Sequence, residues 1–384
     1  MHVSATVAVS RGPLAPAAAQ VLEQVRRAGA VRRDELVTAT RLSPATVGRA
    51  VAQLVDAGLL RECLPKRRRP GVGRPGIPVE VDPDAYVTIG VHVGRRITTV
   101  ALGDVAGHVV ASDTVRRAVG ADPDLTAASQ RAAALLAALP GRVPLSAGVV
   151  GPWRDLGLSP EQVGAELHEL TGLPVRAGDH VAAVAATEFL HRRQGAPGTT
   201  LYVYARDTIG FAVALDAGAQ AEVSQVGSLG HFPSGSDVAC WCGRTGCLEV
   251  TAGDDAVIRA ARDAGLLGVA RANRGVGPIG DLYSRVGEPA VLALVRRRAR
   301  ILGRVAASVR DIVAPDRVVL VGQAFTGCPP VLGDITEAMA EAGLLDEVPV
   351  SFTRFGSGIQ AVAACTIALG PIYDDPLGVV SGVR

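Results

Sequence analysis

The chain has 384 residues, of which 48% are apolar and 20% charged; this composition excludes wholesale disorder and predicts two or three domains of about 100–200 residues. No apolar run reaches the roughly 18 residues of a membrane span, and the N-terminus lacks the pattern of a signal peptide, so we expect a cytoplasmic protein. Residues 1–80 hold 13 basic and 6 acidic residues, whereas the remainder holds 26 and 31. This asymmetry favours a nucleic-acid-binding module on an acidic body, although a solvated basic tail would also produce it.

Three helical segments are predicted before residue 60. Pro13–Ala28 carries apolar residues at helical spacing and is closed by Gly29. A short second helix spans about Arg33–Thr40, and Ser43 followed by Pro44 opens a third that runs to about residue 57. Two helices joined by a short turn, with a strong start signal on the second, predict a helix-turn-helix whose second helix enters a DNA major groove.

The third helix is predicted to carry the side chains that contact bases, next to its capping residue Ser43. We expect its outward positions to be Ala45, Thr46, Arg49, Ala50 and Gln53. Thr46 can contact a thymine methyl group or a phosphate, Arg49 can bind guanine in bidentate fashion, and Gln53 can bind adenine. A helical bundle that does not bind DNA is the alternative.

A basic hairpin is predicted after the third helix. Short apolar strands at about 59–61 and 79–81 flank a stretch rich in proline, glycine and arginine. Such a wing would lie along the DNA backbone, with Arg67 and Arg68 on phosphates and Arg74 in the minor groove. A flexible basic linker is the alternative. Winged helices act as dimers on palindromic double-stranded DNA, so we expect a DNA-binding domain over 1–81 and a dimeric or tetrameric body over 82–384.

The body is predicted to be α/β, because strand and helix patterns alternate from residue 85 onward. The expected strands are Tyr86–Val93, Thr98–Leu102, Val143–Val150, Thr200–Tyr204, Phe211–Leu215 and Val318–Val321. The expected helices cover 124–139, 160–171, 180–193, 254–265 and 288–313, and the last helix starts near Gly358. This alternation predicts two α/β lobes with a cleft between them.

A histidine and three cysteines fall within residues 231–247, at the spacing His-x8-Cys-x-Cys-x4-Cys. They are His231, Cys240, Cys242 and Cys247. One imidazole and three thiolates make a closed tetrahedral zinc set, which is structural because no position is left for substrate. Glycines at 243 and 246 permit the tight turns that bring the sulfurs together. A redox cluster of three cysteines is the alternative.

These motifs together resemble the ROK family of repressors, open reading frames and sugar kinases, from about residue 15 to 375. The resemblance rests on the Gly-His pair before Cys-x-Cys-Gly-x-x-Gly-Cys-x-Glu, on Leu42–Val47 and Asp56–Leu60, and on Gly73-Arg74-Pro75. It implies a winged helix-turn-helix followed by a two-lobed actin/hexokinase-like body. It also implies that the His and three Cys bind zinc, which shapes a sugar pocket.

The nucleotide-binding motifs of the family's kinases are altered in this chain. The first phosphate turn, Asp-x-Gly-Gly-Thr in the kinases, reads His-Val-Gly-Arg-Arg at 92–96. The second, Gly-Thr-Gly-x-Gly, reads Arg-Asp-Thr-Ile-Gly at 206–210, where Asp207 would repel phosphate. The late Gly-Gly turn appears as Val-Gly-Gln-Ala at 321–324. We therefore predict that the chain neither binds ATP nor transfers phosphate.

The sugar-binding motifs are altered less uniformly. Asp179 stands where the resemblance places the kinases' catalytic base, but Gly178 and Ser228 replace an asparagine and a glutamate. Glu249 is retained. We hypothesise that Asp179, His231 and Glu249 line a pocket for a sugar or sugar-derived effector; the alternative is that Asp179 only caps the following helix.

The sequence as a whole predicts a DNA-binding transcriptional regulator, which we expect to be a repressor of carbohydrate-related or other genes. A bound effector would act by favouring one relative orientation of the two wings in a dimer. An ATP-dependent sugar kinase with an appended DNA-binding domain is the alternative. A scaffold that has lost both ligand and operator is disfavoured by the unbroken helix-turn-helix pattern.

Overall fold

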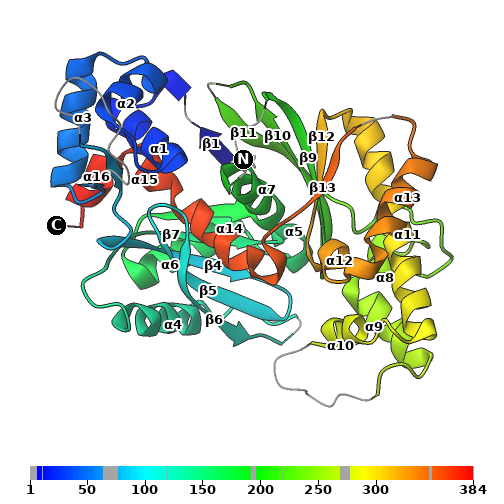
Figure 1. Cartoon of the computed structure of the whole chain (residues 1–384). Helices are drawn as coiled ribbons and strands as arrows, with labels where there is room; N and C mark the ends of the chain where they lie inside the picture. Colours follow the sequence, from blue (N-terminus) through cyan, green and yellow to red (C-terminus); the bar gives the residue numbers. More distant parts are fainter. Residues whose placement is uncertain are drawn as a thin grey trace. The chain divides into compact units, whose positions relative to one another are not determined.

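The computed structural model describes residues 7–10, 12–63, 77–118, 120–191, 196–218, 220–268, 277–345 and 348–383. They fall into two compact units (Figure 1). The first, here the DNA-side unit, comprises Val7–His191, Ala217–Glu222 and Gln360–Arg384. The second, here the metal-side unit, comprises 196–216 and 223–359 of the described residues. Within the described ranges, no helix has the length and apolar character needed to cross a membrane.

The DNA-side unit begins with the predicted helix-turn-helix and its hairpin strands. Its first elements are β1 (Val7–Ser10), the 3-10 turn Gly12–Leu14, α1 (Ala17–Ala28), α2 (Arg33–Thr40), α3 (Pro44–Asp56), β2 (Leu60–Glu62) and β3 (Val79–Val81). Strands β2 and β3 pair antiparallel, which confirms the predicted stem of the hairpin. The predicted start of the first helix at Pro13 is wrong. Pro16 occupies the N-cap of α1, and the residues before it form the separate 3-10 turn.

The three N-terminal helices share a hydrophobic cluster with the last helices of the chain, α15 (Gly370–Asp374) and α16 (Pro376–Ser381). The cluster joins Leu22 and Leu54 of the helix-turn-helix to Tyr373 and Val380. Contacts run from α1 to both C-terminal helices and from α3 to α16, and Figure 1 shows these helices side by side. The hydrophobic core of the helix-turn-helix therefore continues across the predicted boundary at 81/82.

The C-terminal region departs from the prediction that the last helix starts near Gly358. A 3-10 turn (Gly356–Gly358) leads into α14 (Ile359–Ala368), as expected, but α15 and α16 follow it. Both contain a proline in their first turn, where the missing N–H costs no hydrogen bond. Asp375 caps α16 by accepting the N–H of Gly378 at 3.1 Å. The proline at the start of each helix, together with the Asp375 cap, divides the terminal segment into two short helices.

A mixed sheet forms the centre of the DNA-side unit, with strand order β6-β5-β4-β7-β8. The strands are β4 (Tyr86–Val93), β5 (Ile97–Asp104), β6 (Val109–Arg116), β7 (Val143–Gly151) and β8 (Val175–Asp179). The pairs β4–β5 and β5–β6 are antiparallel, whereas β4–β7 and β7–β8 are parallel. Helices α4 (Leu125–Ala137) and α6 (Pro160–Thr171) pack on the face that carries Ile89, Val91 and Val93; α5 (Trp153–Leu156) follows β7.

The opposite face of this sheet is covered at very short range by α14. Side chains alternate along a strand, so Gly90 faces away from Ile89 and Val91. A Cβ at Gly90 would lie 2.6 Å from the backbone N of Cys365, and one at Gly148 would lie 2.5 Å from that of Ala368. Glycine at these two positions therefore lets the helix approach the strands. Helix α7 (His180–His191) contacts α14 through a hydrogen bond from the Thr187 hydroxyl to Thr366 at 3.0 Å.

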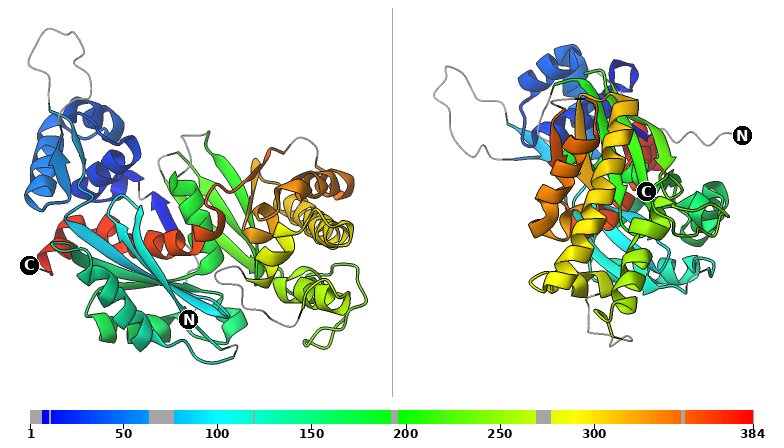
Figure 2. Two further views of the ribbon diagram at one scale, coloured as in Figure 1. Left: turned by 60° about the horizontal axis from the view of Figure 1, so that its bottom comes forward. Right: turned by 90° about the vertical axis from the view of Figure 1, so that its right-hand side faces the viewer.

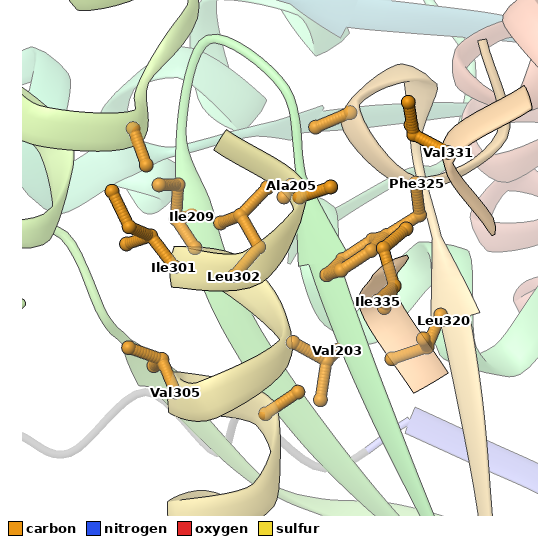
Figure 3. Packing of buried hydrophobic residues seen from close by; sticks show 14 of the residues in the cluster. Val203, Ala205, Ile209, Ile301, Leu302, Val305, Leu320, Phe325, Val331 and Ile335 are labelled. Atoms are coloured by element: carbon orange, nitrogen blue, oxygen red, sulfur yellow. The ribbon is translucent and has the colours of Figure 1, made fainter. Parts of the chain in front are cut away.

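The metal-side unit contains a second mixed sheet, in which β11-β10-β9-β12-β13 are neighbours in that order. Its strands are β9 (Gly198–Ala205), β10 (Ile209–Asp216), β11 (Ala221–Ser228), β12 (Arg317–Val321) and β13 (Val350–Phe352). The helices are α8 (Leu248–Ala252), α9 (Asp254–Asp263), α10 (Pro278–Ser284), α11 (Pro289–Val313), α12 (Gln323–Thr326) and α13 (Leu332–Ala342), with a 3-10 turn at Pro329–Val331. Figure 3 shows Val203 and Leu320 of the sheet packing against Leu302 of α11 and Phe325 of α12.

Candidate nucleic-acid interface and metal centre

The solvent-facing side of α3 carries two of the side chains predicted to contact bases. Arg49 and Gln53 are exposed, and Thr46 is half-buried beside the N-cap. The prediction that Ala50 points outward is wrong, because it lies on the same helical face as Val47 and is only 2% exposed. The predicted outward position of Ala45 is confirmed.

The N-terminus of α3 is held by a local hydrogen-bond network. Ser43 Oγ accepts the backbone N–H of Thr46 at 3.1 Å and lies 2.9 Å from the Thr46 hydroxyl. Pro44 occupies the first turn, which fixes the start of the helix. Arg41, in the turn before it, is exposed and adopts the left-handed conformation with φ of +58°. Its place in the turn of a helix-turn-helix was a signal for a phosphate contact that the sequence analysis did not use.

The arginines of this module divide into paired and unpaired groups. Arg61 binds Glu80 and Asp84, each at 2.9 Å, and these carboxylates raise its pKa. Arg33 binds Glu62 at 3.0 Å. Within the described ranges, Arg41 and Arg49 make no ion pair, so their charge is available to a ligand. The wing residues Arg67, Arg68 and Arg74 lie outside the described residues.

The predicted metal ligands lie together in the metal-side unit. The candidate donor atoms of His231, Cys240, Cys242 and Cys247 are all within 4.8 Å of one another. Cys240 Sγ lies 3.6 Å from His231 Nδ1, and Cys242 Sγ lies 3.6 Å from Cys247 Sγ. In a tetrahedral zinc site with Zn–S bonds of about 2.3 Å, neighbouring sulfurs are about 3.8 Å apart. The four side chains therefore fit one tetrahedral metal ion.

Two tight turns bring the cysteines into this arrangement. Gly243 and Gly246 have φ of +85° and +72°, in the left-handed region that favours glycine. A Cβ at Gly246 would also lie 2.4 Å from the carbonyl oxygen of Ser236. Hydrogen bonds with the backbone N–H and the side chain of Arg244 lower the pKa of Cys242 to about 6. The loop thus favours the thiolate that a metal ion requires at this position.

Glu249 lies next to the metal cluster in the same unit. Its backbone N–H donates to the carbonyl of Gly230 at 2.8 Å, and its carboxylate packs over the Cα of that glycine. A Cβ at residue 230 would lie 2.8 Å from Glu249 Oε2, so a larger residue there would displace the carboxylate. The structure therefore brings His231 and Glu249 into one neighbourhood.

Asp179 belongs to the DNA-side unit, and its surroundings are those of a helix cap. Its Oδ1 accepts the backbone N–H groups of Val181 and Ala182 at 2.7 and 3.3 Å. This is the geometry of the alternative considered from the sequence, in which the carboxylate opens the following helix. Within the described ranges, the second oxygen, Oδ2, takes no hydrogen bond. Capping and ligand binding through Oδ2 are therefore compatible.

The first altered phosphate turn, at residues 92–96, is fixed by protein groups. Gly94 N–H donates to Ile97 O at 3.0 Å, and the Arg117 guanidinium donates to Gly94 O at 2.8 Å. His92, where the kinases of the family have an aspartate, is buried with its ring centroid 6.0 Å from that of His180. Burial lowers the pKa of His180 and so favours its neutral form. A buried imidazole, packed beside a second one, therefore stands where the resemblance places an aspartate in the kinases.

The second altered turn, at residues 206–210, contains a half-buried carboxyl group, that of Asp207. Burial, and beside it the carboxylate of Asp254, raise the pKa of Asp207 to about 6. Asp254 in turn binds the buried guanidinium of Arg298, which also donates to Tyr283 Oη at 2.8 Å and Ala252 O at 2.9 Å. The turn therefore presents acidic groups where a phosphate loop presents free backbone N–H groups.

Comparisons with known proteins agree with this geometry. A model described as the ROK family matches residues 88–354. The chain is 37% identical to transcriptional regulator Rv0485 of Mycobacterium tuberculosis (strain H37Rv), over 94% of this chain and 87% of that protein. It is 24% identical to the DNA-binding transcriptional repressor Mlc of Escherichia coli K12, over 64% of each chain.

A solved structure extends the similarity to nearly the whole fold. A ROK family transcriptional regulator, described as a homologue of the Escherichia coli Mlc protein, superposes with a TM-score of 0.72 and 21% identity. The match covers 95% of this chain and 98% of that one, so the fold is shared from the helix-turn-helix to the C-terminal region. The family model and the 37% identical relative together show that the chain belongs to the ROK family.

Proposed function

We propose that this ROK-family protein is a DNA-binding transcriptional regulator, that it acts as a repressor and that it is not an enzyme. The observation that carries the proposal is α3, the capped second helix of a helix-turn-helix. Its Arg49 and Gln53 are exposed, and neither side chain has a partner among the residues that the structure describes. Arg49 binds guanine, Gln53 binds adenine, and Thr46 contacts a thymine methyl group or a phosphate. Ser43 orients the helix on the backbone, and Arg67, Arg68 and Arg74 of the wing supply phosphate and minor-groove contacts.

The names of two relatives support the proposals that this chain regulates transcription and that it represses its target genes. Rv0485 is named a transcriptional regulator, and Mlc is named a DNA-binding transcriptional repressor. The chain would act as a homodimer or tetramer on a palindromic operator, because winged helices that bind as dimers read two symmetric half-sites. A regulator that binds chromosomal DNA would work in the cytoplasm. Residues 1–81 would form the DNA-binding domain, and residues 82–384 the ROK body.

The body of the protein holds zinc and senses a small ligand. His231, Cys240, Cys242 and Cys247 bind one structural zinc ion, which fixes the loop beside Glu249. A sugar or sugar derivative binds through its hydroxyl groups to Asp179, His231 and Glu249. The ligand changes DNA affinity only by as much as its own affinity differs between the two wing orientations.

A sugar kinase is the weaker alternative. Its first phosphate turn would contain buried His92, and its second would contain Asp207 with a pKa raised to about 6. Neither group assists a phosphate or its metal ion. ATP-dependent phosphorylation of glucose that is lost in Asp179→Asn would overturn the assignment to a non-enzymatic regulator.

Selection of genomic DNA tests the proposal. The purified full chain is incubated with sheared genomic DNA at near-physiological salt, and the retained fragments are sequenced. We expect a palindromic site to be enriched and its neighbouring genes to indicate the effector. The control is a triple variant, Thr46→Ala, Arg49→Ala and Gln53→Ala, in which no core residue of α3 is changed. Equal retention of all fragments by both proteins would show that the chain does not select sequence.

A further inference from the structure

A pocket lies under α1 within the DNA-side unit; the space between its walls is about 450 Å³, a volume that includes the open solvent at its mouth. It is lined by residues of β1, α1, β8, α7, α14 and α15, among them Arg26, Arg176, Leu190, Thr366, Ile367 and Tyr373. None of these residues belongs to the proposed DNA, metal or sugar positions. The lining joins the first helix of the DNA-binding module to the body.

The polar part of this pocket carries an uncompensated positive charge. Arg176 is paired with Asp374 at 2.8 Å, and the buried carboxylate of Glu23 is paired with Arg27 at 2.9 Å. Arg26 is half-buried, with its guanidinium carbon 5.6 Å from the ring centroid of Tyr373. It makes no ion pair or hydrogen bond with any residue in the described ranges. A guanidinium held over an aromatic ring keeps its N–H groups available to an anion.

The remaining part of the lining is apolar. Ala186 and Leu190 come from α7, Ile367 comes from α14, and Leu369 is the N-cap of α15. The Thr366 hydroxyl at this wall is already bonded to Thr187, at 3.0 Å. Among the residues that the structure describes, the pocket thus combines an apolar wall, open to solvent on one side, with the unpaired guanidinium of Arg26 at its edge. An anion with a short hydrocarbon chain matches both parts, whereas a sugar would bring hydroxyl groups to apolar side chains.

We propose that this pocket is a second ligand site, which binds a small carboxylic acid with a short aliphatic chain. The carboxylate receives two N–H groups from Arg26, and the chain packs on Leu190 and Ile367. The site goes beyond the proposed function, since neither operator recognition nor a sugar effector requires it. Arg26 lies on α1, which packs on α3, and Tyr373 lies on α15, which packs on α1. A ligand bound in this pocket would therefore contact α1 and α15, and through α1 it would affect the position of α3.

Calorimetric titration of the full chain tests the site with three probes: hexanoate, its neutral counterpart hexanamide, and inorganic phosphate. We expect hexanoate to bind at least about tenfold more tightly than hexanamide, because only the anion engages the Arg26 guanidinium. Arg26→Gln should weaken hexanoate by about tenfold or more and leave the weak binding of hexanamide unchanged. Arg131→Gln is the matched control, because Arg131 is a surface arginine paired with Asp113 outside the pocket.

Two substitutions of Arg26 are used, so that the proposal can still be contradicted if one of the two variants is unstable. Arg26 has no ion pair to lose within the described ranges, so Arg26→Gln should fold; Arg26→Lys retains the charge but loses the two-pronged geometry and should weaken hexanoate by less. Absence of hexanoate binding at about 10 mM, equal binding of hexanoate and hexanamide, or unchanged binding in Arg26→Gln each contradicts the site. Phosphate that binds more tightly than hexanoate and depends on Arg26 contradicts the carboxylic-acid assignment.

Discussion

The solvent face of α3 and the turn at 206–210 use polar residues in opposite ways. On α3, Arg49 and Gln53 project from a helix whose other face is buried, and within the described ranges Arg49 has no ion-pair partner. In the turn, Asp207 is half-buried beside Asp254, which is itself bound by Arg298. The side chains of α3 can still form hydrogen bonds with a ligand, whereas the carboxylates at the turn interact with other groups of the protein. From this comparison we propose that recognition lies in the helix-turn-helix and that the turn at 206–210 has a structural role.

The largest effect on stability is expected from a change in the metal cluster. It tests whether a bound metal ion, rather than a bound nucleotide, stabilises the metal-side unit. Cys242→Ser should abolish zinc binding and lower the free energy of unfolding of the metal-side unit by roughly 3–5 kcal/mol, part of the ~10–16 kcal/mol that zinc contributes to small zinc domains. Metal analysis and calorimetry measure both. Cys63→Ser, at a half-buried thiol outside the cluster, should keep the zinc. Unchanged zinc content and melting temperature in Cys242→Ser would refute the site.

The next largest effect is expected on the pH dependence of stability, from the half-buried carboxyl of Asp207 in the turn at 206–210. The pKa of Asp207 is raised to about 6, so its contribution to stability is present below about pH 4 and is lost as the pH rises through 6. Ionisation at pH 8 then costs about 2–3 kcal/mol. Asp207→Asn should therefore raise the melting temperature at pH 8 and leave it nearly unchanged at pH 4. Asp263→Asn, at an exposed carboxylate of α9, should show no such pH dependence; equal shifts of Asp207→Asn at both pH values contradict the assignment.

A smaller effect is expected on α3 and is confined to DNA binding. Arg49→Ala should weaken binding to the operator by about 1–3 kcal/mol and relax the preference for guanine at one position. Binding curves on the operator and on a single-base variant measure the change. Arg262→Ala removes the same charge from an exposed position on α9 and should have little effect. Equal losses on operator and random DNA for Arg49→Ala would mean that α3 presents a different face to the bases.

The smallest effect separates capping from ligand binding at Asp179. Asp179→Ala removes the acceptor of two backbone N–H groups and should cost about 1 kcal/mol of stability, whereas Asp179→Asn keeps an acceptor and should cost less. Both variants should lose the heat of sugar binding. Titrations of the wild-type chain with sugars, sugar phosphates and amino sugars give the reference. Absence of heat with the whole panel would leave Asp179 as a helix cap alone.

The sequence predicted those elements that are determined by residues close together in the chain. The predicted bounds of α2 and β4 are confirmed residue for residue, and the Ser43 cap is confirmed by its hydrogen bond. The close grouping of the His and three Cys was also predicted, because a metal site requires ligand types at defined spacing. Capping, helical periodicity and ligand spacing are properties of short segments, so the sequence alone is enough for them.

Elements that depend on distant partners were missed. Strand β6 (Val109–Arg116) is a partly exposed edge strand of mixed polarity, and its pairing with β5 decides its structure. The polar strand β11 and the helix α13 were likewise not predicted. Ala50 was misplaced because alanine carries little information about which face is buried. The buried pair of Arg298 and Asp254 joins residues 44 positions apart, which no local pattern indicates.

The central claim is tested most directly by the ratio of two dissociation constants, one for the selected palindrome and one for a shuffled duplex of the same composition. Measured at one near-physiological salt concentration, the ratio should reach about 10³ or more and collapse when Arg49 and Gln53 are both changed to alanine. A ratio near one, in a preparation that phosphorylates glucose with ATP, would contradict the account and make the chain a sugar kinase.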